Sequence, residues 1–359
     1  MSVSESVLKE NKIKFVCIGN LYETALEVKD NVEVQVGKKE EGKTVKCKQI
    51  TGKVSVDTGS GVVTLFPQFN EIGYDGKENV RWTMAKSMLD WNPKIKGDSS
   101  KPVTRVMLEG ILNYYDGYVR DSNKPELKKS YRIERATTSV SDAIEDGFSF
   151  EGYFFIAGTN VNDETGVGSI KAYYSNYRGE VIPVECIVDS EDVEIVFEGD
   201  GDDFEAIEPG QTRQLKISYY RTAEANTEVE ETKTKKFGGN RKTAPDIPTH
   251  NRFKEEYVLT SASECPVKEP EEEFDDEGNP IDVNSVWYNP VAVKKAIKAR
   301  AQKLEEMENN PPEKKSGSSV KKSGNSSLQA KKQASKDKMK SGMKAQASFD
   351  AFDDKEDPF

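Results

Sequence analysis

The sequence predicts a mainly β protein with two antiparallel barrels, followed by an irregular segment, one helix and a disordered C-terminal tail. Apolar and polar residues alternate with a period of two over most of residues 12–220, which is typical of half-buried antiparallel strands. Gly-containing turns separate these runs, and no helical periodicity lies between them, which favours barrels over βαβ units. After about Arg221 the chain becomes polar and rich in Pro, Gly and charged residues.

The first predicted β domain covers residues 1–98. The stretch KIKFVCIGN is expected to be a strand that ends in a Gly-Asn turn, and alternating valines at Val32, Val34 and Val36 predict another strand. A connector follows, ENVRWTMAKSMLDWNPKIK, which contains two of the three tryptophans and a short helix expected around Thr83–Leu89.

The second predicted β domain covers residues 99–223. It begins at PVTRVMLEGILNYYDGYVR and continues through GFSFEGYFFIAG, GSIKAYYSNYRGEVIPVECIV and QTRQLKISYYR. These runs give about six short strands, which is enough to close a barrel. The two β domains share no clear residue-level repeat, so a duplication is suggested only by their similar size and type.

Three further segments follow the barrels. Residues 224–308 are expected to be irregular and acidic apart from a helix near 290–307, for which Asn289 is a suitable cap and Pro290 a suitable first residue. Residues 309–348 are rich in Lys and Ser, with ten lysines and two acids between Pro311 and Ser348. Too few apolar residues are present there to offset the entropy of ordering, so this linker is expected to be disordered. Residues 349–359 form an acidic tip.

Composition excludes several classes of protein. The formal net charge is −11, from 52 basic and 63 acidic side chains, which argues against a uniformly basic nucleic-acid binder. The four cysteines are widely spaced without a CxxC pair, and His250 is the single histidine. A disulfide framework, a cysteine zinc site and histidine-based catalysis are therefore not expected. The N-terminus lacks the apolar core of a signal peptide, so we expect a cytoplasmic protein, in the host cytoplasm if the source is viral.

Two motifs that suggest catalysis have simpler explanations. GKKEEGKT, Gly37 to Thr44, matches the phosphate-loop pattern, but the alternating stretch TVKCKQI follows it, whereas a phosphate loop leads into a helix. We interpret it as a charged hairpin turn. The acidic runs GDGDDFEAIE and PEEEFDDEGNPID lack the ligand spacing of an EF-hand. No metal, no cofactor and no catalytic residue is predicted, and the protein is not expected to be an enzyme.

Aromatic residues interleaved with cations indicate a surface for single-stranded DNA. Bases can stack on exposed rings while Lys and Arg meet the phosphates. Adjacent aromatic residues in a strand point to opposite faces, so one of Tyr173 and Tyr174 is expected outside the barrel, and likewise one of Tyr114 and Tyr115. The alternative is that most of these rings belong to the core. The predicted DNA-binding residues are Arg81, Trp82, Lys86, Trp91, Tyr114, Lys171, Tyr173, Tyr177 and Arg178.

The last residues, AFDDKEDPF, combine acids with aromatic rings. A terminal Phe presents a hydrophobic group and an anion together, which a partner can capture in an apolar pocket rimmed by cations. The predicted partner-docking residues are Phe352, Asp353, Asp354, Glu356, Asp357, Pro358 and Phe359.

This ending resembles the acidic tip of bacterial and phage single-stranded DNA-binding proteins, which runs through several Asp to a final Pro-Phe. Asp357 stands where the bacterial tip usually has an aliphatic residue. The arrangement of barrels, linker and tip is also similar, and the segments EEYVLTSASECP and WYNPVAVKKAIKAR resemble parts of large phage proteins of this kind. The resemblance implies OB-like barrels, sequence-independent coating of single strands during replication, recombination or repair, and recruitment of partner proteins through the tip. The alternatives are a phage structural or scaffolding protein and, less favoured, a metal-dependent nuclease.

Overall fold

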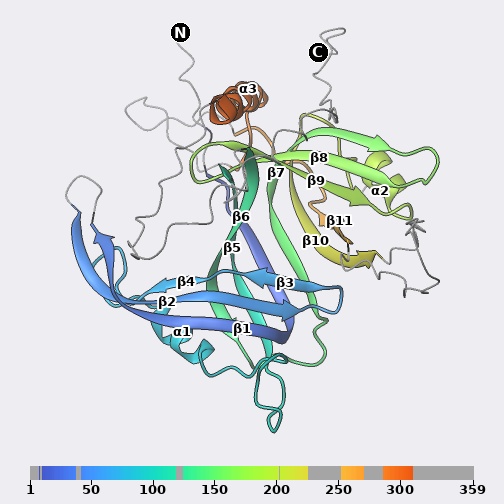
Figure 1. Ribbon diagram of the computed structural model, residues 1–359. Coiled ribbons are helices and arrows are strands. Elements are labelled where there is room, and N and C mark those ends of the chain that lie inside the picture. Colours follow the sequence, from blue (N-terminus) through green and yellow to red (C-terminus); the bar gives the residue numbers. More distant parts are fainter. Residues whose placement is uncertain are drawn as a thin grey trace, which may run out of the picture. The chain divides into compact units, whose positions relative to one another are not determined.

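Within the described part of the chain, eleven strands form one continuous sheet that curls into two barrel-like halves (Figure 1). The computed structural model describes residues 8, 10–37, 42–118, 124–201, 203–224, 252–270 and 286–309. All of them lie in one compact unit, Met1–Pro311. The prediction of a mainly β protein is confirmed.

The second half is a closed five-stranded barrel. Its strands are β7 (Gly147–Val161), β8 (Gly168–Ser175), β9 (Val181–Val188), β10 (Thr212–Glu224) and β11 (Arg252–Ala262). Antiparallel pairing joins β7 to β8, β8 to β9, β10 to β11 and β10 to β7. A parallel contact between β9 and β11 closes the ring. With a short helix between its third and fourth strands, this arrangement is an OB fold.

The first half follows the same plan but stays open. Its elements are β1 (Ile13–Val36), β2 (Lys43–Asp57), β3 (Val62–Leu65), β4 (Gln68–Asn70), α1 (Trp82–Met88), β5 (Arg105–Tyr118) and β6 (Pro125–Thr137). β1 pairs with β2, β2 pairs with β3 and β4, and the β5–β6 hairpin returns along β1. No pairing joins β3 to β6 among the residues described, so a seam remains between these two edge strands.

The strand pairing groups the strands differently from the domains that the sequence predicts. The predicted domain of residues 99–223 includes β5 and β6, yet these strands pair with β1 and with each other. We propose two OB-like halves, residues 13–137 and 147–262. The predicted boundaries themselves stay a prediction, because the contacts separate only Met1–Pro311 from Pro312–Phe359.

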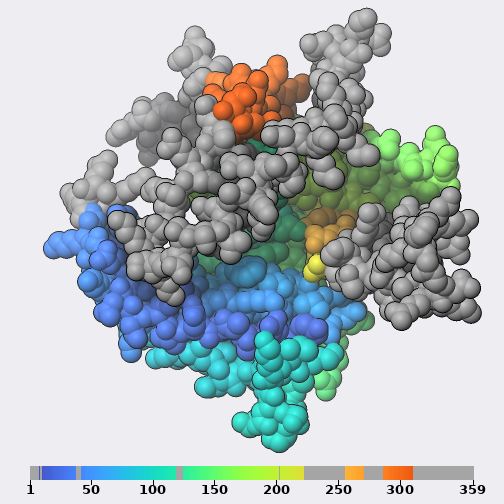
Figure 2. All heavy atoms as spheres, in the orientation of Figure 1, coloured from blue at the N-terminus to red at the C-terminus, as the bar shows by residue number. Residues whose placement is uncertain are grey.

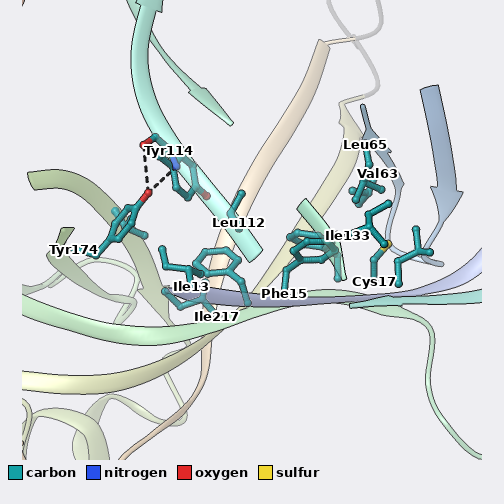
Figure 3. Packing of buried hydrophobic residues seen from close by; sticks show 14 of the residues in the cluster. Ile13, Phe15, Cys17, Val63, Leu65, Leu112, Tyr114, Ile133, Tyr174 and Ile217 are labelled. Atoms are coloured by element: carbon teal, nitrogen blue, oxygen red, sulfur yellow. Dashed lines mark hydrogen bonds between the residues drawn. The ribbon is translucent and has the colours of Figure 1, made fainter. Parts of the chain in front are cut away.

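β1 holds the two halves together. Residues Lys14 to Ile18 pair with β5 on one edge and with β7 on the other. On the inner face, Phe15 stacks against Phe148 with ring centroids 5.9 Å apart and meets the edge of Tyr131 at 5.4 Å. Figure 3 shows Phe15 in this core, with Cys17 and Ile133 nearby. One hydrophobic core therefore runs through both halves.

The structure differs from the predicted first strand at Gly19. The strand was expected to end there, but β1 continues through Gly19 and Asn20 to Val36. A Cβ on Gly19 would lie 2.1 Å from the carbonyl oxygen of Asp57, so only glycine allows β1 and β2 to approach this closely. Further along, β1 and β2 pair up to Val36 and Lys43. Lys38 to Glu41 of the GKKEEGKT motif lie outside the described residues, so the charged turn stays a prediction.

The segment predicted to be irregular contains a strand and the expected helix. β11 was missed because its apolar residues, Tyr257 to Leu259, form a short run without alternation that follows three charged residues. The helix near 290–307 is α3 (Pro290–Asn309), and the Asn289 side chain accepts hydrogen bonds from the first backbone N–H groups of its first turn. A second short helix, α2 (Val193–Glu198), precedes β10. The linker at 310–348 and the tip at 349–359 lie outside the described residues.

Candidate nucleic-acid interface

The tryptophans predicted to contact DNA pack into the protein. Trp82 is only 4% exposed and lies on the inner side of α1 with Ala85 and Met88. Trp91 is half-buried against the same core, whereas Lys86 is exposed. α1 thus caps the first half, and its rings are not presented to a ligand in this arrangement. The DNA-contact role of Trp82 and Trp91 remains a prediction that the proposal below does not use.

In the tyrosine pairs, the structure decides which ring faces inward. Tyr114 is 4% exposed, and its backbone N–H donates to the Tyr174 hydroxyl at 2.6 Å (Figure 3). Tyr115, on the opposite face of β5, is half-buried. The sequence had favoured Tyr114 as the outer residue of this pair, but burial assigns that place to Tyr115. In β8 the outer residue is Tyr173, as expected.

Tyr173 lies beneath α3. Its ring packs with Phe155, Val181, Tyr288 and Val293 in a small apolar cluster between the barrel and the helix. Lys171 is on the same outward face of β8, opposite Glu185 on β9. The exposed side of α3 is visible in Figure 2, in orange. Tyr173 is therefore available to a ligand only beside or below this helix.

Exposed Tyr177 and Arg178 form a cluster with the half-buried Tyr115, which we call the tyrosine–arginine patch. The Arg178 guanidinium lies 5.1 Å from the Tyr177 ring centroid and 6.0 Å from that of Tyr115. The Nε of Arg178 donates to the Tyr177 hydroxyl at 2.9 Å. Tyr177 is 51% exposed. An accessible ring beside a cation is the combination that single-strand binding requires.

α3 supports the side of the molecule that carries this patch. Arg300 makes a bidentate ion pair with the buried Asp116, with N–O distances of 2.7 and 2.9 Å. Lys303 pairs with Glu180, close to the patch. Partial burial alone raises the pKa of Glu180, but hydrogen bonds from Lys303 and Asn176 outweigh it and hold this pKa below the ordinary value of 4.5.

The predicted DNA-binding residues therefore fall into two groups. Arg81, Trp82, Lys86 and Trp91 belong to α1 and its flanks, whereas Tyr177 and Arg178 follow β8 near α3. In Figure 1, α1 and α3 lie at opposite ends of the molecule. The structure does not bring the two groups into one site.

A crevice that the sequence did not predict lies at the open seam of the first half. We call it the seam crevice; its volume is about 260 Å³. Its lining residues are Val62, Val63, Thr64, Phe66, Tyr114, Lys129, Tyr131, Phe148, Tyr219, Arg221, Glu255 and Tyr257. The aromatic and basic composition of KKSYR and ISYYR was a usable signal, but only the fold brings these strands together.

A second, larger cleft differs from the seam crevice in its charged lining. This cleft of about 1220 Å³ lies over the outer face of β1, β5 and β7. Its charged lining residues are Lys12, Lys14, Arg135, Lys216, Glu109, Glu134, Glu145, Asp146 and Glu151. Four cations facing five carboxylates give no net attraction for a polyanion, so we do not assign DNA to this cleft.

Two further findings on the described residues concern metal binding and membrane insertion. Among the described residues, no group of three or more His, Cys, Asp or Glu is arranged to hold a metal ion. No helix in that part of the chain is long and apolar enough to cross a membrane. The predicted docking residues Phe352 to Phe359 lie outside the described residues.

Comparisons with known proteins give remote structural matches. No protein-family model matches the chain, and no curated protein sequence matches it significantly. Among solved structures, the wild-type single-stranded DNA binding protein from Thermus aquaticus aligns with 11% identity and a TM-score of 0.33, over 74% of this chain and 97% of that chain. A deletion mutant of the same protein aligns with 10% identity and a TM-score of 0.30, over the same shares. Scores this low do not establish a common fold, so the OB assignment depends on the strand pairing.

Proposed function

We propose that this protein binds single-stranded DNA without sequence preference and is not an enzyme. The observation that carries the proposal is the tyrosine–arginine patch, where an exposed ring and a guanidinium stand together on a rigid strand and the turn that follows β8. The OB topology adds support, because such barrels commonly present a strand face to oligonucleotides. A fold alone does not define function, so the patch has to be tested directly.

In this proposal a base stacks on Tyr177 while Arg178 meets the adjoining phosphate. Stacking uses the π-face that every base has, and the phosphate contact is the same at every nucleotide. Binding is therefore expected to vary little with sequence and to weaken as salt rises. No cofactor or divalent ion is required, because the protein supplies both the rings and the cations.

Oligo-dT binding followed by fluorescence anisotropy tests the proposal. Replacing Tyr177 by Ala is expected to weaken binding by about 1–3 kcal/mol, the contribution of one stacked base. Tyr220→Ala is a matched control, since Tyr220 is also exposed, at 39%, but lines the mixed-charge cleft. Equal affinity of wild type, the Tyr177 variant and an Arg178→Ala variant would contradict the proposed site.

The same assay separates the alternatives. Binding that survives EDTA, with no cleavage when magnesium is added, is expected here; magnesium-dependent cleavage would favour the nuclease alternative. Absence of binding to single strands at low salt would leave the scaffolding alternative.

We further propose that the acidic tip recruits replication, recombination or repair proteins, in the cytoplasm of a phage-infected cell if the source is viral. Its carboxylates repel phosphates, so the tip alone adds no affinity for DNA. Deleting Asp350 to Phe359 is expected to leave DNA binding equal or tighter at low salt and to abolish capture of partner enzymes. A truncated protein that binds single strands markedly more weakly would contradict this assignment.

A further inference from the structure

The seam crevice contains a cation surrounded by tyrosines. The Lys129 ammonium lies 5.0 Å from the ring centroid of Tyr257, 5.4 Å from that of Tyr219 and 6.0 Å from that of Tyr114. It also donates a hydrogen bond to the Tyr257 hydroxyl. These contacts hold the ammonium among the lining residues of the crevice.

The Glu255 carboxylate lies between this ammonium and a second cation, Arg221. The Glu255 oxygens are 3.7 Å from Lys129 Nζ and 4.0 Å from Arg221 Nε. Both distances exceed a hydrogen bond, and the Glu255 side chain is 46% exposed. Such an ion pair contributes little to stability and can be exchanged for another anion at small cost.

We propose that the seam crevice takes up one unstacked nucleobase of the bound strand, with its phosphate between Lys129 and Arg221 in the place of the Glu255 carboxylate. This inference rests on the proposed binding of single-stranded DNA and adds a second point of contact to it. Glu255 then acts as an internal competitor, which the strand displaces when it binds.

The size and lining of the crevice suit a base. A volume of about 260 Å³ lies just below the usual range for drug-sized ligands, so it accommodates one base but not two stacked nucleotides. Phe66 lines the opening and is 69% exposed, which leaves its ring free to stack. Tyr131 and Tyr219 provide further rings on the inner side.

The hydroxyl of Tyr219 can donate a hydrogen bond either to the Glu255 carboxylate or to the phosphate that replaces it. Burial, followed by the hydrogen bond and negative charge of Glu255, raises the pKa of Tyr219 above its usual range. The hydroxyl therefore stays protonated at neutral pH and can donate to a phosphate oxygen once Glu255 has moved away.

The first test removes the competitor. Glu255→Gln is expected to tighten oligo-dT binding about three- to tenfold at low salt, because one repulsive charge beside a phosphate is lost, with little change at high salt. Glu191→Gln, an exposed carboxylate beside α2, is the matched control for net charge and is expected to change affinity less than twofold. Unchanged or weaker binding by the Glu255 variant would overturn the proposal.

The second test addresses the base and the phosphate separately. Phe66→Ala is expected to weaken binding at least about fivefold without lowering the melting temperature, because one stacked base is lost from an exposed ring. Lys129→Gln is expected to reduce the slope of log K against log salt by about 0.7, the value for one phosphate contact on a single strand, and Lys129→Arg to restore it. A purely structural role for Lys129 would lower stability and leave the slope unchanged, which also overturns the proposal.

Photocrosslinking to oligonucleotides with 5-iodo-deoxyuridine gives direct evidence. We expect crosslinked peptides that contain Phe66, Tyr219 or Tyr257. Failure of the seam inference remains distinct from failure of the proposed function. If wild type binds oligo-dT and the Tyr177 variant is impaired while the Glu255, Lys129 and Phe66 variants behave as wild type, only the seam inference is wrong.

Discussion

Replacing Arg300 by Ala is expected to release α3 from the barrel. The Asp116 side chain is 1% exposed and that of Arg300 is 17% exposed, so the ion pair is largely removed from water. Without Arg300, the Asp116 carboxylate would be buried with no cation to balance it. Breaking a buried pair in this way costs about 3–5 kcal/mol.

Undocking of α3 limits how much this substitution can destabilise the whole protein. Two buried side chains dock this segment on the barrel, Val293 in α3 and Tyr288 just before the helix, and burial of two such groups stabilises by about 3–6 kcal/mol in total. The two quantities are similar, so undocking of the helix relieves Asp116 more cheaply than unfolding of the barrels. The variant should therefore open locally rather than globally.

Trypsin cleavage within α3 measures this opening, because proteolysis follows the population of the open form when reclosing is fast. A loss of about 3 kcal/mol raises that population roughly 150-fold, and the cleavage rate with it. Lys303→Ala is the control: the Lys303 side chain is 38% exposed, so its pair with Glu180 is expected to contribute less than about 1 kcal/mol.

A double variant, Asp116→Leu with Arg300→Met, tests whether the unpaired Asp116 carboxylate causes the opening of α3. Replacing both charges by apolar groups leaves no unpaired carboxylate, so cleavage should return close to the wild-type rate. If Arg300→Ala is cleaved no faster than Lys303→Ala, the ion pair does not hold the helix and the reasoning is wrong.

Three more predictions concern stability and are checked by urea or thermal unfolding. Gly19→Ala is expected to destabilise by about 3 kcal/mol or more, because its Cβ would collide with the backbone of Asp57, whereas Gly147→Ala, with nothing within 4 Å of the new Cβ, should cost less than about 1 kcal/mol. Arg213→Lys should cost about 2–4 kcal/mol, because Arg213 is fully buried and its guanidinium donates to three backbone carbonyls that a single ammonium cannot reach together. The pKa of Glu180 is lowered in the folded protein, so its charged carboxylate stabilises the fold at pH values above the ordinary pKa of 4.5. This contribution should be lost as the pH falls from 4.5 through the folded pKa, and the loss should be larger in wild type than in Lys303→Ala.

Local pattern was sufficient for several elements of this protein, but not for β11 or for the full length of β1. Alternation over β5, β7 and β8 marked them as strands, and the helix α3 was recognisable from its Asn289 cap and Pro290 start. These signals depend on residues within a few positions of each other. The same local information predicted that one tyrosine of each adjacent pair lies outside the barrel.

Such local signals do not predict which strands pair when the strands lie far apart in the sequence. Nothing near Arg105 to Thr137 says that β5 and β6 pair with β1 rather than with the later strands, because β1 precedes them by about ninety residues. For the same reason the sequence did not separate Tyr114 from Tyr115. Which face of β5 is inside depends on where β1 and β8 lie.

The sequence alone determined that the protein is mainly β and that aromatic residues alternate with cations along its strands and turns. Folding decided which of those rings are accessible. It buried Trp82 and Tyr114, covered Tyr173 with α3, and left Tyr177 and Arg178 exposed. The seam crevice could not be predicted from local sequence, because its lining residues Phe66, Lys129 and Glu255 come from three separate segments of the chain. The physical reason is that alternation reports which residues can be buried, whereas burial itself requires a second surface, and the chain supplies that surface from far along the sequence.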